Sequence, residues 1–387
     1  MFKKNKNFDK LLEYSMLAYH GGKIESYVLG YIKNAKIIDI TSAYPYAMTK
    51  LQKPLNKTLI SSDLDVLNSF FYAFIRCDVT ILQKEFIHPL IIPSPLNPTN
   101  ISPYGYIKDI VITKVEYDYL IKNNIEVKVH DFIGVYSDPD EFPFRDLIIK
   151  LFNERIEYKE INPSRSEMNK TILNSLYGIN HELTDVYLES GKNIVWAGYR
   201  AGDYFNSVVS SYITAMIRTQ LSATSNNIVK SGGKVYLNMT DSIIYDGDVN
   251  PNIINDKKVL GMYDKPKDIV DVYILGAGRY EFKGEFNQKF TIKNRGFSVS
   301  VKDKGFYNQL ELNGEIVLDH RTFVTAFKAT TNKYGFEKMG HLIDDNYNID
   351  PFNLGGKRII DNRNVNLNKE YTTTSPVYID KDFLMKG

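Results

Sequence analysis

Two aspartates in this sequence stand where turns of the chain would present them, and their carboxylates could hold divalent cations. Asp39 closes the apolar run from Ala35 to Ile40, which has the pattern of a buried strand with a carboxylate at its edge. Asp241 lies in the run from Lys234 to Tyr245, which predicts two short strands around a tight turn. Phosphoryl transfer with two metal ions needs carboxylates that converge from different segments, so this pair could provide them. Taken singly, each aspartate is more often a turn or cap residue.

The residues after Asp39 could recognise a sugar. Tyr44 follows in DITSAYP, where the end of a strand enters a turn stopped by Pro45. A tyrosine at this place can lie beneath a sugar ring and clash with a 2′-hydroxyl, which would select deoxynucleotides. A buried core tyrosine explains this motif about equally well when it is taken alone.

Further polar residues share one face of a predicted helix. Lys170, Asn174 and Tyr177 of KTILNSLYG follow one another at i, i+4 and i+7. This arrangement suits a triphosphate lying across the helix with the aromatic ring against a base. Arg155 and Lys159, four residues apart on the preceding helix, could direct two more cations at the same phosphates. The alternative is a solvated helix face with glutamate partners.

The elements that would position these residues follow from apolar periodicity and from breaker residues. We expect helices at Phe8 to Tyr19, Arg145 to Tyr158, Asn162 to Tyr177 and Asp203 to Lys230. Asn162 is the expected N-cap of the third helix, with Pro163 as its first residue. Pro54 to about Pro143 predicts a mixed insertion, and the chain from about Asn332 predicts an irregular C-terminal part.

Bulk properties narrow the class of protein. A chain of 387 residues can bury one large core or two to three smaller ones. Its formal net charge of +2 gives no protein-wide field that would attract nucleic acid, so contacts with DNA must come from local basic clusters. The single cysteine, Cys77, excludes an intramolecular disulfide and a cysteine-based zinc site. No apolar run reaches the ~20 residues that span a bilayer, and the start is no secretory signal, so we expect a soluble, cytoplasmic protein that is not secreted.

Together the motifs resemble those of a known family. DITSAYP, KTILNSLYG and MTDS, in this order, resemble motifs A, B and C of the family B DNA polymerases. AYHGG at Ala18 to Gly22 resembles the YxGG element of the protein-primed phage and linear-plasmid branch, and ITAMIRTQ at Ile213 to Gln220 resembles its palm helix. Co-occurrence in this order from about Tyr19 to Tyr280 favours the family over coincidence.

The resemblance implies an α+β right-hand polymerase fold, with an antiparallel palm sheet, fingers, a thumb and two insertions similar to the family's terminal protein regions. It divides the chain into an N-terminal element with the first part of the palm (1–53), a first insertion (54–144), fingers (145–180), a short second insertion (181–202), a second part of the palm (203–298) and a thumb (299–387).

It also implies roles for individual residues. The catalytic residues and metal ligands would be Asp39 and Asp241, assisted by the backbone near Ile40, with two Mg²⁺ ions and Mn²⁺ as a substitute. The nucleotide would be bound by Ser42, Ala43, Tyr44, Arg155, Lys159, Lys170, Asn174 and Tyr177. The DNA would be contacted by Tyr19, Gly21, Gly22, Ser175, Gly178, Thr240, Arg279 and Tyr280.

The implied partners are template-primer DNA, deoxynucleoside triphosphates and a priming terminal protein, with no membrane. Motif A begins so early that no exonuclease domain fits before it, so we expect the chain to lack 3′–5′ exonuclease activity and a separate exonuclease subunit to supply it, if any does. The expected setting is replication of a viral or plasmid genome in the cytoplasm of a host cell.

Three positions depart from the family pattern. Met239 replaces the first aspartate of DTDS, Gly278 replaces the lysine of KxY, and Ala43 stands where leucine is usual. Asp241 retains the second motif C carboxylate, which favours reduced over absent activity. The alternatives are a catalytically impaired polymerase-like module for DNA binding or assembly, a primase or RNA-making enzyme, and a structural protein with coincidental motifs.

Overall fold

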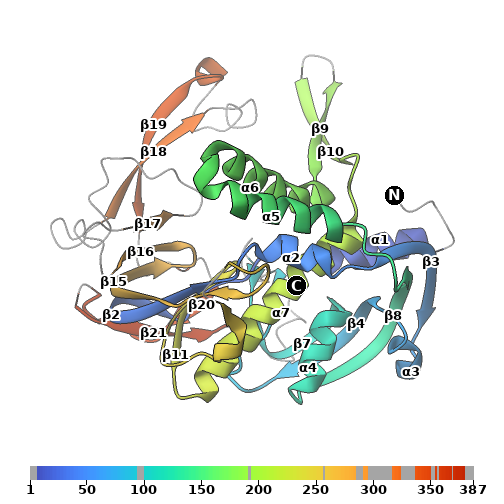
Figure 1. Ribbon diagram of the computed structural model, residues 1–387, viewed down its shortest axis with the longest axis horizontal. Coiled ribbons are helices and arrows are strands. Elements are labelled where there is room, and N and C mark those ends of the chain that lie inside the picture. Colours follow the sequence, from blue (N-terminus) through green and yellow to red (C-terminus); the bar gives the residue numbers. More distant parts are fainter. Residues whose placement is uncertain are drawn as a thin grey trace.

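The computed structural model describes residues 7–93, 100–190, 193–255, 258–284, 291–294, 316–323, 336–349, 354, 357–367 and 369–379. Within these residues no helix combines the length and apolar character needed to cross a membrane. The chain is arranged around two mainly antiparallel sheets that share the long helix α7 (Ser207–Lys230), as Figure 1 shows.

The larger sheet carries the residues of interest at one end. Its described strands run in the order β1 (Ile24–Ser26), β11 (Lys234–Met239), β12 (Ser242–Asp246), β2 (Val28–Asp39), β15 (Lys267–Gly276), β16 (Arg279–Gly284) and β17 (Thr291–Asn294), all paired antiparallel. The predicted strand at Ala35 to Ile40 is the last part of the longer β2. The two strands predicted around Asp241 are confirmed as β11 and β12.

The helix α7 covers one face of this sheet through contacts with β11 and β12. α2 (Ala43–Thr49) packs on α7, and α1 (Phe8–Leu17) packs between α7 and strands of the second sheet, in a shared core that includes Ile38 of β2 and Ile243 of β12. The helix predicted at Asp203 to Lys230 begins later, because the side chain of Asn206 accepts a hydrogen bond from Val209 N and caps α7 there.

The second sheet belongs mainly to the region between motifs A and B. Its order is β22 (Tyr378–Ile379), β7 (Tyr104–Thr113), β4 (Tyr72–Ile81), β8 (Glu126–Asp138) and β3 (Lys53–Ser61). Accompanying short elements are α3 (Leu64–Leu67), α4 (Lys114–Lys122), β5 (Ile92–Pro93) and β6 (Asn100–Ile101). The mixed character predicted from Pro54 to Pro143 is therefore confirmed. The sheet shares the core of α7 through residues such as Tyr72 and Ile133.

A helical hairpin projects over α2. α5 (Arg145–Ile161) and α6 (Pro163–Gly178) confirm the two predicted helices, and the side chain of Asn162 caps α6 by accepting a hydrogen bond from Arg165 N at 3.1 Å. The short helix η1 (Ile179–His181) then leads to a two-stranded ribbon of β9 (Leu183–Ser190) and β10 (Asn193–Ala201). In Figure 1 this ribbon rises beside the hairpin.

The C-terminal part contains regular strands. β18 (Ile316–Phe323) and β19 (Leu342–Ile349) form a separate pair. β21 (Tyr371–Pro376) pairs with β2 and with β20 (Arg358–Ile360), and β22 pairs with β7. The prediction of an irregular chain from Asn332 is thus wrong for these segments. Their short strands are stabilised by pairing with distant strands, which local periodicity cannot reveal. The remaining short elements are η2 (Pro251–Ile253), β13 (Ile254–Asn255), β14 (Tyr263–Asp264) and η3 (Phe336–Lys338).

Candidate functional site

The two aspartates singled out from the sequence meet at the end of the larger sheet. Asp39 is the last residue of β2 and lies opposite Ser242, the first residue of β12. Asp241 occupies the turn immediately before Ser242, and Ile40 N donates a hydrogen bond of 2.9 Å to the backbone carbonyl of Asp241. Strand register therefore brings together two carboxylates about 200 positions apart in the chain.

Both turns at this end have unusual backbone geometry. Thr240 has φ +62° and Ser42 has φ +50°, a region that β-branched and other non-glycine residues rarely adopt. In the first turn Asp241 N donates to Met239 O at 2.7 Å, and Thr240 N donates to Lys23 O at 2.7 Å. Strain of this kind persists only where surrounding contacts enforce it, and it concentrates at functional sites.

The electrostatics of the pair favour a cation. Burial and then the charge of Asp39 raise the pKa of Asp241 to about 6. Burial also raises the pKa of Asp39, although nearby Lys267 opposes this. Oxygen ligands are what Mg²⁺ prefers, and a divalent ion would relieve the repulsion of the two charges, so this donor set fits a metal. Among the described residues no group of three or more His, Cys, Asp or Glu side chains is placed to hold a metal ion, so this site offers two carboxylates.

Three tyrosines from distant segments form a cluster beside the carboxylates. The rings of Tyr44 and Tyr177 stack with centroids 4.6 Å apart and an interplanar angle of 10°. The hydroxyl groups of Tyr177 and Tyr19 share a hydrogen bond of 3.1 Å. Gly22 lies so close that a Cβ atom there would be 2.5 Å from the hydroxyl of Tyr44 and 2.9 Å from Cγ2 of Thr240. Only glycine permits this approach.

The cationic side chains of the helical hairpin differ in their contacts and in their exposure to solvent. Arg155 donates to the Ser42 hydroxyl at 3.1 Å, which joins α5 to the turn after Asp39. Lys170 is partly exposed and pairs with Glu167 at 2.8 Å. Lys159 is exposed, as are Asn174, Ser175 and Gly178. Of the predicted nucleotide-binding residues on the hairpin, Arg155 and Tyr177 therefore contact the turn and helix that follow Asp39. Lys159 and Asn174 are exposed, and Lys170 pairs with Glu167 of its own helix.

The pair Arg279 and Tyr280 begins β16. Tyr280 is buried, and burial together with the charges of Asp39 and Asp241 raises its pKa. Burial lowers the pKa of Arg279. Gly278 has φ +81° in the turn between β15 and β16, so the position that carries lysine in the family pattern here has a backbone conformation suited to glycine.

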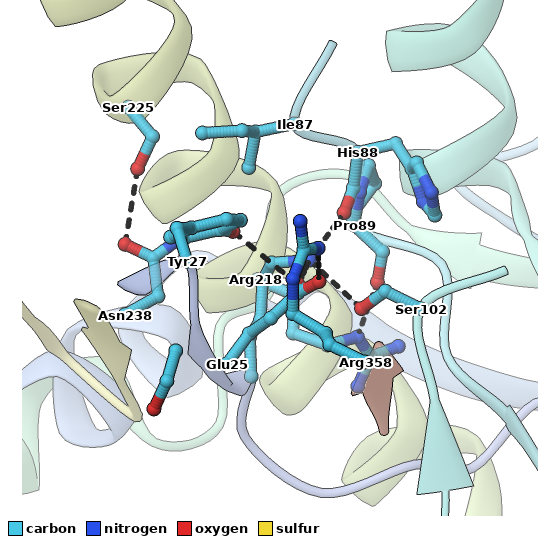
Figure 2. Close-up of polar contacts among 12 residues, drawn as sticks. Glu25, Tyr27, Ile87, His88, Pro89, Ser102, Arg218, Ser225, Asn238 and Arg358 are labelled. Carbon is cyan, nitrogen blue, oxygen red and sulfur yellow. Dashed lines mark hydrogen bonds and ion pairs between the residues drawn. The ribbon is translucent and has the colours of Figure 1, made fainter. Parts of the chain in front are cut away.

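A buried arginine that the sequence analysis did not assign fixes the glycine segment. Arg218 of α7, fully buried, donates to the carbonyls of His20 at 2.6 Å and Gly21 at 3.0 Å, and pairs with Glu116 of α4 at 2.6 Å. A fourth hydrogen bond from Arg218 reaches Pro89 O, and Figure 2 shows Pro89 beside Arg218. The sequence signal was a lone charge in the middle of a predicted helix of mostly small and apolar residues. Its partners could not be read from the chain.

A second buried charge network, also missed, lies next to it. Lys23, just before β1, pairs with Glu25 of β1 at 2.7 Å. Arg358 of β20 also pairs with Glu25, and Figure 2 shows these two side chains together. Lys23 also donates to His88 O at 2.9 Å. A cavity of about 650 Å³ beside this network is lined by Gly21, Gly22, Ile24, Glu25, Ile91, Asn100, Ile101, Ser102, Met239, Thr240 and Lys357. Met239, the departure in motif C, lines this cavity and packs against the apolar cluster of the larger sheet.

Comparison with known proteins gives consistent matches. The sequence model of the family described as DNA polymerase type B, organellar and viral, matches residues 7–179. A DNA polymerase of Acidianus bottle-shaped virus (isolate Italy/Pozzuoli) is 30% identical over 163 residues, which are 42% of this chain and 21% of the viral protein. A probable DNA polymerase of Podospora anserina is 22% identical over 342 residues, covering 75% of this chain and 27% of the fungal protein. The chain thus spans about a quarter of the length of these two relatives.

Among solved structures, phi29 DNA polymerase in an orthorhombic crystal form superposes with a TM-score of 0.67 at 16% identity, over 88% of this chain and 63% of that one. Phi29 DNA polymerase complexed with primer-template DNA and incoming nucleotide substrates gives a TM-score of 0.65 at 16% identity, over 90% of this chain and 63% of that one. The chain therefore has the mixed α+β fold, with an antiparallel curled sheet, that is found in phi29 polymerase.

Proposed function

We propose that this chain is a DNA polymerase of the organellar and viral type B family, whose sequence model matches residues 7–179, and that it adds deoxynucleotides to the 3′-hydroxyl of a primer on a DNA template. The observation that carries the proposal is the meeting of Asp39 and Asp241 at the end of the larger sheet, with raised pKa values and with the tyrosine cluster beside them.

The two carboxylates would hold Mg²⁺, or Mn²⁺ as a substitute, with help from the backbone at Ile40. Two bound ions would lower the pKa of the attacking hydroxyl and neutralise charge that develops on the phosphates. The contribution of the chain is to hold the two carboxylates in position. Strand register and the hydrogen bond from Ile40 N to Asp241 O keep the two carboxylates together before any substrate arrives, so little reorganisation is needed.

The nucleotide would bind between the helical hairpin and α2. Arg155, Lys159 and Lys170 would receive the triphosphate, and Asn174 and Tyr177 would meet the base. Ser42, Ala43 and Tyr44 would line the sugar, with Tyr44 as the gate against ribonucleotides. Support comes from the hydrogen bond between Arg155 and Ser42 and from the stack of Tyr44 on Tyr177, which join these segments directly.

The DNA would pass over the same end of the sheet. Tyr19, Gly21, Gly22, Ser175, Gly178 and Thr240 would contact the template and the nascent pair, and Arg279 and Tyr280 the primer. The close approach of Gly22 to Tyr44 and Thr240 supports a role of the glycine segment at this place.

The architecture proposed for this activity is a right hand. The larger sheet with α7 would be the palm, α5 and α6 the fingers, and the part after 298 the thumb; the region 54–144 and the β9–β10 ribbon would be the two insertions. We further propose protein priming, with the first insertion as the docking surface, in the cytoplasm of a host cell. The similarity of fold to phi29 polymerase supports this arrangement. The lack of exonuclease activity, and its supply by a separate subunit, stay predictions.

A catalytically impaired DNA-binding module is the second candidate, because Met239 replaces a motif C carboxylate and its side chain packs with apolar neighbours. A primase-like activity is a third, and incorporation of ribonucleotides in place of deoxynucleotides would distinguish it.

The deciding experiment is extension of a labelled primer on a defined template with the four deoxynucleotides and Mg²⁺. The parent protein should extend, and Asp241→Ala should lose at least about a thousandfold in rate, because one ligand to both ions is gone. Asp248→Ala is the matched control, since Asp248 lies beyond the opposite end of β12 from Asp241 and its side chain is almost fully exposed. If the parent extends nothing with Mg²⁺ or Mn²⁺ yet binds primer-template DNA, the impaired module is the better reading.

A further inference from the structure

His181 lies outside every motif of the sequence, yet it packs face to face on one of the clustered tyrosines. The rings of His181 and Tyr19 are stacked with centroids 3.4 Å apart and an interplanar angle of 17°. The same Tyr19 shares its hydroxyl hydrogen bond with Tyr177, four residues before His181. Tyr19 therefore contacts one short segment twice: its hydroxyl bonds to Tyr177 at the end of α6, and its ring stacks on His181 of the following helix η1.

His181 is itself fixed by α7. Its Nδ1 atom lies 3.2 Å from the hydroxyl of Ser210, the side chain of which also donates to Ser207 O. Phe205 packs against the imidazole with ring centroids 5.6 Å apart. Burial lowers the pKa of His181 to about 4, so the ring is neutral at ordinary working pH and stacks without an ionic charge.

These contacts join three segments at one point. Tyr19 belongs to the stretch before β1 that Arg218 ties to α7, and Tyr177 stacks on Tyr44 after the Asp39 turn. The base of the α5–α6 hairpin is thus connected through Tyr19 and His181 to the same helix, α7, that supports the sheet of the two carboxylates.

We propose that His181 is a positioning residue that anchors the base of the α5–α6 hairpin to Tyr19 and α7, and so sets how the nucleotide-binding face of the hairpin lies relative to Asp39 and Asp241. The inference rests on the proposed function. His181 touches neither substrate nor metal in this role and acts through Tyr19 and Tyr177.

The expected kinetic signature follows from geometry. A loosened base tilts the hairpin, and small misplacements of reacting groups lower the rate of the chemical step more than they weaken binding. The variant His181→Ala should lower kcat for the correct nucleotide by about three- to tenfold, in line with the size of one aromatic stacking contact, and should reduce discrimination against mismatched nucleotides. The affinity for primer-template DNA should stay within about twofold, because His181 makes none of the proposed DNA contacts and Tyr19 is only one of several residues that would make them.

The experiment compares three variants in single-nucleotide extension on one primer-template. His181→Phe keeps a flat ring against Tyr19 and should stay within about twofold of the parent, whereas His181→Ala should not. His130→Ala changes an exposed histidine of β8 in the other sheet; it is the matched control and should leave kcat unchanged. A purely structural histidine would lower the melting temperature of His181→Ala without changing kcat or discrimination, and that result overturns the proposal.

Hydrogen exchange of the protein without substrates provides a readout that needs no activity. His181→Ala should raise exchange at the backbone amides of residues 174–181 and 18–22, and leave α4 unchanged. If the parent cannot extend any primer, the proposed function fails. Hydrogen exchange alone then tests whether His181 anchors the base of the α5–α6 hairpin. Unchanged exchange at both segments in His181→Ala overturns the anchor whatever the activity.

Discussion

The end of the larger sheet and the helical hairpin face each other, and they are built in opposite ways. Asp39 and Asp241 are held by strand register and backbone hydrogen bonds, and the glycine segment beside them is tied down by the fully buried Arg218. The hairpin instead exposes Lys159 and much of Lys170 to solvent. Under the proposed function, the carboxylates that align the chemistry would be fixed in advance, while the hairpin groups that receive the triphosphate would gain their geometry from that substrate.

The sharpest test of this contrast compares two arginines. Arg218→Met should lower the free energy of unfolding by about 3–5 kcal/mol, because it leaves the Glu116 charge buried without its partner. Arg165→Met on the hairpin, where Arg165 pairs with Glu154 at 3.4 Å in a partly exposed setting, should cost about 0–1 kcal/mol. Urea unfolding measures both.

A double variant in the same unfolding experiment tests whether the unpaired charge causes the loss. Adding Glu116→Gln to Arg218→Met should recover part of the loss, since the unpaired charge disappears. Equal costs for the two single arginine variants would break the comparison between a preorganised sheet end and an adaptable hairpin.

Lys170→Ala tests the hairpin as the substrate-handling part. The variant should raise the KM for nucleotide by about 10- to 100-fold, the worth of one hydrogen bond to a charged group, and change kcat less. Single-nucleotide extension at varied nucleotide concentration measures this. Glu167→Gln, which removes the resting partner of Lys170, should leave KM unchanged or lower it. A fall in kcat at constant KM would place Lys170 among the preorganised groups instead.

Asp241→Asn tests the end of the larger sheet through the pH dependence of stability. The pKa of Asp241 is raised from 3.8 to about 6, so the folded chain keeps a proton that the unfolded chain has already lost. Stability should therefore fall as pH rises from about 4 to about 6, and the loss is complete above that range. Without metal at pH 7.5 the variant should be more stable than the parent by about 1–2 kcal/mol, less than the full shift implies because Asp241 is partly exposed.

A divalent metal ion should make the parent more stable than Asp241→Asn. Mg²⁺ should raise the melting temperature of the parent and have much less effect on Asp241→Asn, because the variant lacks one carboxylate ligand. A parent whose stability is independent of pH from 4 to 6 would contradict the repulsion inferred at the site. Thermal melts across that range, with and without Mg²⁺, decide it.

The smallest expected effect concerns the turn of the hairpin. Asn162→Ala removes the cap that accepts from Arg165 N and should cost about 1 kcal/mol of stability. Asn174→Ala changes an exposed asparagine inside the same helix and should cost almost nothing. Urea unfolding distinguishes the two, and equal losses would show that the N-cap does not stabilise α6.

The parts of the site that could be predicted from the sequence are those set by short-range interactions. The Asn162–Pro163 start of α6 and the tight turn that carries Asp241 are confirmed, because caps, proline and turns act over only a few residues. The ends of elements were less well predicted. β2 extends back to Val28, since pairing with β15 and β21 continues a strand whose own pattern breaks at Lys33 and Asn34.

By itself, then, the sequence determined which residues could do chemistry, the family they resemble and most of the helices that carry them. Only the tertiary structure decided what fixes those residues in place: the partners of Arg218, the stack of His181 on Tyr19, and the return of β21 and β22 to two different sheets. These contacts join residues up to several hundred positions apart, and their energies depend on burial and mutual geometry, which no local pattern of side chains encodes.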